Sequence, residues 1–152
     1  MKEIIAIESP ISKSLLFKKI LKLWNTARAG AKLSGYLAEI VETIPNMTKT
    51  TVLQDFYWNT SALPQDLKTY RENTVEKRNI DDIAFEEISI AILEITEANI
   101  SLSKDDLIRL TARSFDFQKV GSQIDSLLNQ VIESMLQNNQ LIQNGDRLKV
   151  VH

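Results

Sequence analysis

The stretch "LSKDDLIRLTARSFDFQKVG", Leu102–Gly121, follows the pattern of "ISKSLLFKKILKLWNTARAG", Ile11–Gly30, which begins 91 residues earlier. When Ile11–Glu42 is placed over Leu102–Glu133, no gap is needed and six of the 32 pairs are identical. The identical pairs are Ser12/Ser103, Lys13/Lys104, Leu16/Leu107, Gly30/Gly121, Leu37/Leu128 and Glu42/Glu133. Any two amphipathic helix pairs share part of such a pattern, but the absence of gaps favours a duplicated unit. We therefore predict that one structural unit occurs twice.

Apolar residues within the repeat recur at the spacing of an α-helix, which predicts two helices in each unit. In the first unit this spacing places Trp24 with Leu16 and Ile20 on an inner stripe, and it leaves Lys18 and Lys22 outside. A second inner stripe is formed by Leu33, Leu37, Ile40 and Ile44. Basic residues also recur in register, at Lys18/Arg109, Lys22/Arg113 and Arg28/Lys119.

Residues typical of helix ends stand at the borders of these stripes. Ser12 and Ser103 are expected N-caps, because a serine hydroxyl accepts a hydrogen bond from a free backbone N–H in the first turn of a helix. Gly30 and Gly121 fall between the two stripes of each unit, where a tight turn needs a permissive backbone. The sequence therefore predicts helix, turn, helix in both halves.

Short β-forming stretches follow each helix pair. After the second pair, "NQLIQNGDRLKVV" carries Asn144-Gly145 between apolar strands, which predicts a type I′ hairpin. After the first pair comes "TKTTVLQDFYW", in which Phe56 and Trp58 share one strand face and Tyr57 takes the other. We expect two of these rings in the core and Tyr57 exposed.

The order of helix, helix, turn, helix and hairpin is typical of the winged helix-turn-helix. The fold class expected is mostly α with small β-hairpins (α+β), arranged as tandem winged helix-turn-helix-like units. The first unit spans residues 1–60, a connector spans 61–79, and the second unit spans 80–152. The first helix of the first unit, "KEIIAIE", is short, and we interpret the chain as a fragment of a longer one.

Composition narrows the classes of function. The 152 residues carry a net charge of −2 and no cysteine, which leaves no disulfide or thiolate ligand and is typical of an intracellular protein. No apolar run is long enough to span a membrane, so no membrane partner is expected. The cytoplasm is the default location.

Catalysis has few candidate residues. The only histidine is His152, at the end of the chain, and no cysteine nucleophile exists. The adjacent acids Asp81-Asp82, Glu86-Glu87 and Asp105-Asp106 diverge on a helix and are interpreted as solvated residues of helix N-termini. We expect no catalytic residues, no metal, no cofactor and no small-molecule substrate.

Several stretches of the sequence are together similar to the sequence pattern of a known family. They are "IIAIESPIS", "ARAGAKL", "DFYW" and "YREN…RNIDDIAFEEISIAI", which span most of residues 1–133. The chain resembles the uncharacterised C-terminal domain of large bacterial superfamily I DNA/RNA helicase-like proteins. It departs from that pattern at Ser9, where glycine is expected, and at Ser12, where histidine is common.

The resemblance implies a non-catalytic accessory module of an ATP-driven helicase whose motor lies elsewhere in the parent chain. Consistent with this, no GxxxxGK[ST] phosphate-binding loop occurs in the sequence. The remainder of the parent chain is therefore an expected partner.

DNA or RNA is the other expected partner, since the third helix of a winged helix enters the major groove. The candidate contact residues are Arg28, Lys32, Lys49, Lys119, Gln123, Arg147 and Lys149. Gln123 has the amide geometry that reads adenine, and the others are expected to meet phosphates.

Acidic residues on the same third helices support an alternative. Glu39, Glu42, Asp125 and Glu133 would repel phosphate, so these faces could instead dock the motor domain or another protein. The sequence leaves both hypotheses open.

Overall fold

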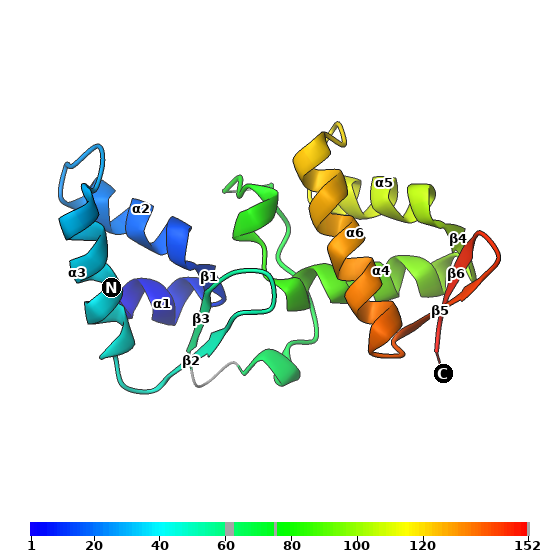
Figure 1. The fold of residues 1–152 in the computed structure, drawn as a ribbon, viewed down its shortest axis with the longest axis horizontal. Helices are drawn as coiled ribbons and strands as arrows, with labels where there is room; N and C mark the ends of the chain where they lie inside the picture. Colours follow the sequence, from blue (N-terminus) through cyan, green and yellow to red (C-terminus); the bar gives the residue numbers. More distant parts are fainter. Residues whose placement is uncertain (60–62, 75, 152) are drawn as a thin grey trace. The chain divides into compact units, whose positions relative to one another are not determined.

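The computed structural model describes residues 1–59, 63–74 and 76–151, which form two compact units, Met1–Asp66 and Leu67–His152 (Figure 1). The described residues have a mixed α/β architecture with six α-helices and two small three-stranded antiparallel sheets. Residues 67–79, which the sequence analysis assigned to a connector, belong to the second compact unit. Residues 60–62, 75 and 152 of the predicted ranges lie outside the described residues.

The first unit contains three α-helices and one sheet among its described residues, which can be followed in Figure 1. Its elements are α1 (Lys2–Glu8), β1 (Ile11–Ser12), α2 (Lys13–Leu23), α3 (Ala31–Glu42), β2 (Met47–Thr50), β3 (Phe56–Asn59) and the short 3₁₀ turn η1 (Pro64–Asp66). The strand order is β1-β3-β2, and all pairs are antiparallel. The hairpin strands β2 and β3 are therefore joined by a third, two-residue strand from between the first two helices.

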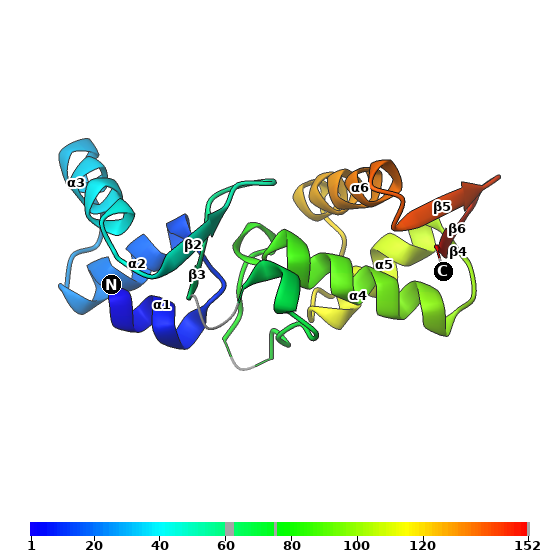
Figure 2. The ribbon, with the colours of Figure 1, turned by 90° about the horizontal axis from the view of Figure 1, so that it is seen from below.

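The second unit repeats this order of elements (Figure 2). Its elements are the 3₁₀ turn η2 (Ile80–Asp82), α4 (Phe85–Ala98), β4 (Leu102–Ser103), α5 (Lys104–Ser114), α6 (Ser122–Gln137), β5 (Leu141–Asn144) and β6 (Arg147–Val150). The strand order β4-β6-β5 corresponds to that of the first sheet. The first helix differs most between the units, because α4 has 14 residues and α1 has seven.

Backbone hydrogen bonds keep the 91-residue spacing found in the sequence. Thr26 N–H donates to the Leu21 carbonyl at 2.9 Å, and the equivalent Phe117 N–H donates to the Ala112 carbonyl at 3.0 Å. The two turns thus leave their helices in the same way, and the turns Trp24–Gly30 and Phe115–Gly121 have seven residues each. The next residues after the helix caps, Asn25 and Asp116, have φ of 51° and 60°, a left-handed conformation that Asn and Asp tolerate better than most residues.

The predicted N-caps are confirmed. Leu15 N–H donates to Ser12 Oγ at 3.0 Å, and Asp106 N–H donates to Ser103 Oγ at 3.2 Å. Each serine also belongs to the short strand that precedes its helix. One serine in each unit therefore accepts a hydrogen bond from a free backbone N–H of its helix. The same serine joins that helix to the sheet.

The predicted hairpin after the second helix pair is confirmed, but its turn is shifted by one residue. Asn144 is the last residue of β5 and pairs with Arg147, so Gly145 and Asp146 form the two-residue loop. Gly145 has φ +64°, and Asp146 does not have positive φ. This pattern fits a type II′ turn, with glycine at the first central position, and not the predicted type I′.

The core of the first unit corrects two expectations. Tyr57, expected to be exposed, is fully buried and packs with Ile5, Leu16 and Leu37, because β3 is the central strand and this face of it meets the helices. Trp24, expected on the inner stripe, is 54% exposed. Helix α2 ends at Leu23, and Trp24 is the C-cap residue that follows it.

A buried carboxylate fixes the segment that precedes α4. Glu87, expected to be a solvated residue, is fully buried and accepts hydrogen bonds from the Arg71 Nε–H at 3.0 Å and the Arg78 Nη1–H at 2.9 Å. Asn73 closes the same loop, since its Oδ1 accepts from the Arg78 backbone N–H at 2.7 Å and its Nδ2–H donates to the Arg78 carbonyl at 2.9 Å. Arg71 and Arg78 thus hold the first turn of α4 through Glu87.

Burial by itself raises the pKa of Glu87, but the hydrogen bonds and charges of Arg71 and Arg78 outweigh it, and the pKa lies below its ordinary value. A carboxyl with a lowered pKa in the folded state stabilises that state above its unfolded pKa, which is about 4.3. This contribution is lost as the pH falls through the lower folded-state pKa.

We expect Glu87→Ala to lower the free energy of unfolding by about 3 kcal/mol, because Arg78 would remain buried without its partner. Urea denaturation followed by circular dichroism measures this change. The exposed Glu94 on the same helix serves as the matched control, and Glu94→Ala should change stability by less than about 0.5 kcal/mol. Glu87→Gln should also reduce the loss of stability below about pH 4.3. An unchanged acid dependence in Glu87→Gln would contradict this role.

Candidate nucleic-acid interface

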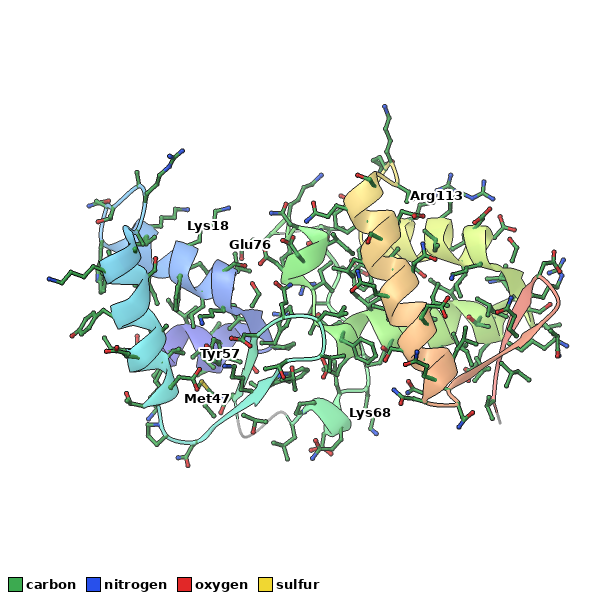
Figure 3. The ribbon with its side chains drawn as sticks, in the orientation of Figure 1. Lys18, Met47, Tyr57, Lys68, Glu76 and Arg113 are labelled. Atoms are coloured by element: carbon green, nitrogen blue, oxygen red, sulfur yellow. The ribbon has the colours of Figure 1, made fainter. Side chains whose placement is uncertain are left out.

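Three basic side chains of the first unit line one groove. Lys18 and Lys22 extend from α2, and Arg28 lies on the turn that leads to α3 (Lys18 is labelled in Figure 3). The groove has a volume of about 750 Å³, and Phe17 and Leu21 form part of its apolar wall. An open groove with cations over an apolar wall can accept an extended anionic chain.

These cations are available for an external anion. Lys18, Lys22 and Arg28 are exposed, and none forms an ion pair with any residue that the structure describes. The neighbouring Lys19 differs, because its Nζ lies 2.6 Å from a carboxylate oxygen of Glu8. Three uncompensated positive charges around one concave surface give a local positive potential, although the whole chain carries a net charge of −2.

The first turn of α3 adds a fourth candidate. Lys32 is exposed at the second position of α3, whose first turn contains no acidic residue. Ser34, which follows Lys32 on the same helix, also lines the groove. Further along α3 the exposed charged residues are Glu39 and Glu42, so positive charge is confined to the N-terminal end of the helix.

Lys49 lies in a different environment from the groove cations. Its Nζ is 3.1 Å from Glu42 Oε1 and 3.2 Å from Asp55 Oδ2. Hydrogen bonds with Glu42 and with Asp55 raise the pKa of Lys49, and burial opposes them weakly. Its charge is already balanced within the protein, and Lys49 does not line the groove.

Tyr57, which is labelled in Figure 3, belongs to the same network. The Tyr57 hydroxyl donates to Glu42 Oε1 at 3.3 Å. Burial, followed by the charge of Glu42, raises the pKa of Tyr57 to about 12, because both disfavour a phenolate at this position. The cluster of Tyr57, Glu42, Lys49 and Asp55 therefore joins the end of α3 to the sheet.

The structure does not gather the candidates of the second unit into one groove. Lys119 and Gln123 are exposed at the turn before α6 and on its first turn. Arg147 donates to the Ser101 carbonyl at 3.1 Å, and Lys149 lines a separate hollow that also includes Ile100. Arg147 and Lys149 thus belong to strand β6, and the hollow beside Lys149 does not include Lys119.

Sequence reasoning did not nominate Lys18, Lys22 or Arg113, although it recognised their recurrence in register. Arg113, labelled in Figure 3, is the counterpart of Lys22, and it is exposed and forms no ion pair within the described residues. Arg109, the counterpart of Lys18, is instead paired with Asp106. Recurrence of charge at equivalent repeat positions was the available signal.

Other kinds of site have less support in the described part of the chain. No three His, Cys, Asp or Glu side chains gather there as metal ligands would. His152 lies outside the described residues. No helix in residues 1–59, 63–74 or 76–151 is long and apolar enough to cross a membrane.

Part of the chain matches a known family. Residues 1–35 match a family described as a protein of unknown function (DUF3320). No curated protein and no solved structure matches the chain. The matched residues include α1, β1 and α2, and they contain the three cations that line the groove, Lys18, Lys22 and Arg28, together with Lys32 on the first turn of α3.

We expect Tyr57 to ionise near pH 12, because its ring is buried beside Glu42. Absorbance at the tyrosinate band during alkaline titration should show this step in the native protein, and Tyr57→Phe should remove it. A raised pKa in the folded state also means that the stability contributed by neutral Tyr57 is lost as the pH rises above about 10 towards that value. The matched variant Tyr36→Phe, on an exposed ring, should keep the late step.

Proposed function

We propose that the chain is a non-catalytic accessory domain of a superfamily I helicase-like ATPase that binds DNA or RNA through winged-helix-like units. The parent protein would supply the ATP-driven motor and would place this domain in the cytoplasm. The resemblance of residues 1–133 supports the link to a helicase, and the match of residues 1–35 is compatible with an uncharacterised accessory region.

The order of elements supports the winged-helix proposal. In each unit three helices are followed by a β-hairpin, and the strand between the first two helices joins the hairpin. The seven-residue turns between the second and third helices are longer than the three to four residues usual in helix-turn-helix proteins. The third helices α3 and α6 are the recognition helices of this proposal.

The observation that carries the proposal is the groove lined by Lys18, Lys22 and Arg28. Phosphate contacts by such side chains supply most of the sequence-independent affinity for nucleic acid. Because Glu39 and Glu42 follow Lys32 on α3, the N-terminal end of this helix is the part that approaches a phosphate backbone. We infer binding with little sequence specificity, centred on the first unit.

Neutralising one groove cation should weaken binding of a fluorescent 20-nucleotide duplex or single strand. For Lys22→Gln or Arg28→Gln we expect about fivefold weaker binding at about 50 mM salt. The slope of log K against log salt concentration should fall by about one, which corresponds to the loss of one phosphate contact. Fluorescence anisotropy across a salt series measures both quantities.

Lys49→Gln is the matched control, because it removes the same charge from the same unit but outside the groove. It should change the affinity by less than about twofold. Equal losses in Lys49→Gln and Arg28→Gln would assign the effect to net charge instead of the groove. No binding of DNA or RNA by the native chain at about 50 mM salt would refute nucleic-acid binding.

A second candidate function, docking to the motor or to another protein, is favoured by the composition of α6. Between Ser122 and Gln137 this helix carries Asp125 and Glu133 but no lysine or arginine, and Glu133 is paired with Lys104 of α5 at 2.6 Å. Asp125 is exposed and accepts a hydrogen bond from Asn129 at 3.2 Å. Such a surface repels phosphate and suits a basic protein partner.

Charge reversal on α6 separates the two candidates. If α6 docks a protein, Asp125→Lys should reduce co-purification with the remainder of the parent chain by about tenfold, since one good charge pair contributes more than about 1 kcal/mol. Asp105→Lys, at an exposed position on α5, provides the control. Stronger binding of nucleic acid by Asp125→Lys, with unchanged co-purification, would instead favour α6 as a nucleic-acid contact.

A further inference from the structure

Two aromatic residues at the same position of the repeat differ completely in burial. Trp24 follows α2 and Phe115 follows α5, and both are the C-caps of their helices with similar backbone angles. Trp24 is 54% exposed, whereas Phe115 is fully buried. Since the local backbone is shared, the difference must come from what covers each ring.

The second unit shows what covers this position. The ring of Tyr70 lies 5.0 Å from the ring of Phe115 at an interplanar angle of 58°. Tyr70 is held there because the next residue, Arg71, is bound to the buried Glu87 of α4. Lys77 also reaches the adjacent Asp116, at 3.3 Å. A polypeptide segment that bears an aromatic residue and continues into the first half of a helix therefore closes this end of α5.

The first unit contains no counterpart of that cover. Helix α1 has seven residues where α4 has 14, and none of residues 1–59 and 63–66 corresponds to the N-terminal half of α4. Leu23 is 72% exposed at the position that is Ser114 in the second unit. A large apolar residue stands where the covered unit has a small polar one.

Helix α3 has an exposed ring at a related position. Tyr36, 58% exposed, is the counterpart of the half-buried Leu127, and α6, which carries Leu127, contacts the turn η2 that leads into α4. Leu23, Trp24 and Tyr36, which we name the uncovered face, are all exposed, and Trp24 stands at the position that Tyr70 covers in the second unit. An exposed aromatic side chain at a position that is covered in the equivalent unit indicates an unfilled binding surface.

We propose that the uncovered face binds a polypeptide segment that presents an aromatic ring to Trp24 and continues into an apolar helix, as Leu67–Ala91 does in the second unit. The ring-to-ring contact supplies affinity, because aromatic residues packed in this way dominate protein interfaces. This inference does not depend on nucleic-acid binding, since Leu23, Trp24 and Tyr36 do not line the cationic groove.

The probe is a fluorescein-labelled peptide with the sequence of residues 67–91, added to the full chain. We expect saturable binding by anisotropy. Acrylamide quenching of tryptophan fluorescence should show where the peptide binds, because Trp58 is fully buried and Trp24 is the accessible tryptophan of the two. Bound peptide should lower the quenching of Trp24.

Trp24→Ala should weaken peptide binding by at least about thirtyfold, as removal of an interface tryptophan typically does. Ile142→Ala removes an exposed apolar side chain elsewhere and should leave the affinity unchanged. The peptide with Tyr70→Ala should bind as weakly to the native chain as the native peptide binds to Trp24→Ala. Circular dichroism should show that each variant remains folded.

Four outcomes would overturn the proposal. They are absence of peptide binding at high micromolar concentration, equal binding to Trp24→Ala, equal binding by the Tyr70→Ala peptide, and protection of Trp24 by an oligonucleotide but not by the peptide. Self-association of the native chain that Trp24→Ala abolishes would also overturn it, because a second copy would then be the occupant. If Lys22→Gln and Arg28→Gln leave the affinity for nucleic acid unchanged, this proposal still stands, because it concerns a different surface.

Discussion

The buried carboxylate of Glu87 is the interaction on which closure of the second unit depends. Arg71 and Arg78 converge on it, and the backbone of Arg78 is in turn held by Asn73. A buried carboxylate without these partners would be unfavourable by several kcal/mol, about 3 or more, so the segment and the helix must order together. This coupling brings the Tyr70 ring onto Phe115 and completes the core at the end of α5. The first unit lacks such an anchor and leaves Trp24 exposed.

Features determined by local chemistry were predictable from the sequence. The serine caps, the helix pairs and the hairpin each follow from residue types within a few positions of one another, and each is found in the structure. Features that depend on a third element were not predictable in this way. The burial of Tyr57 requires a central strand, the exposure of Trp24 follows from an absent cover, and the burial of Glu87 requires two arginines from a preceding loop.

The candidate interface was predictable only in part, for a related reason. Residue type identifies a cation, but only its neighbours decide whether its charge is available. Lys49 has the same side chain as Lys22, yet it lies between Glu42 and Asp55, whereas Lys22 lines a groove without an ion pair to the described residues. Agreement between equivalent positions of the repeat was informative for Lys22 and Arg113, which are both exposed, but not for Lys18, whose counterpart Arg109 is paired with Asp106.

The two copies of the repeat each complete their own sheet with a strand from between their first two helices. The backbone hydrogen bonds that close each sheet thus come from strands of the same unit. Side chains on the surface of a unit can change while this closure of its sheet is kept. The aromatic C-caps illustrate the difference that results, since Trp24 is 54% exposed in the first unit and Phe115 is fully buried in the second.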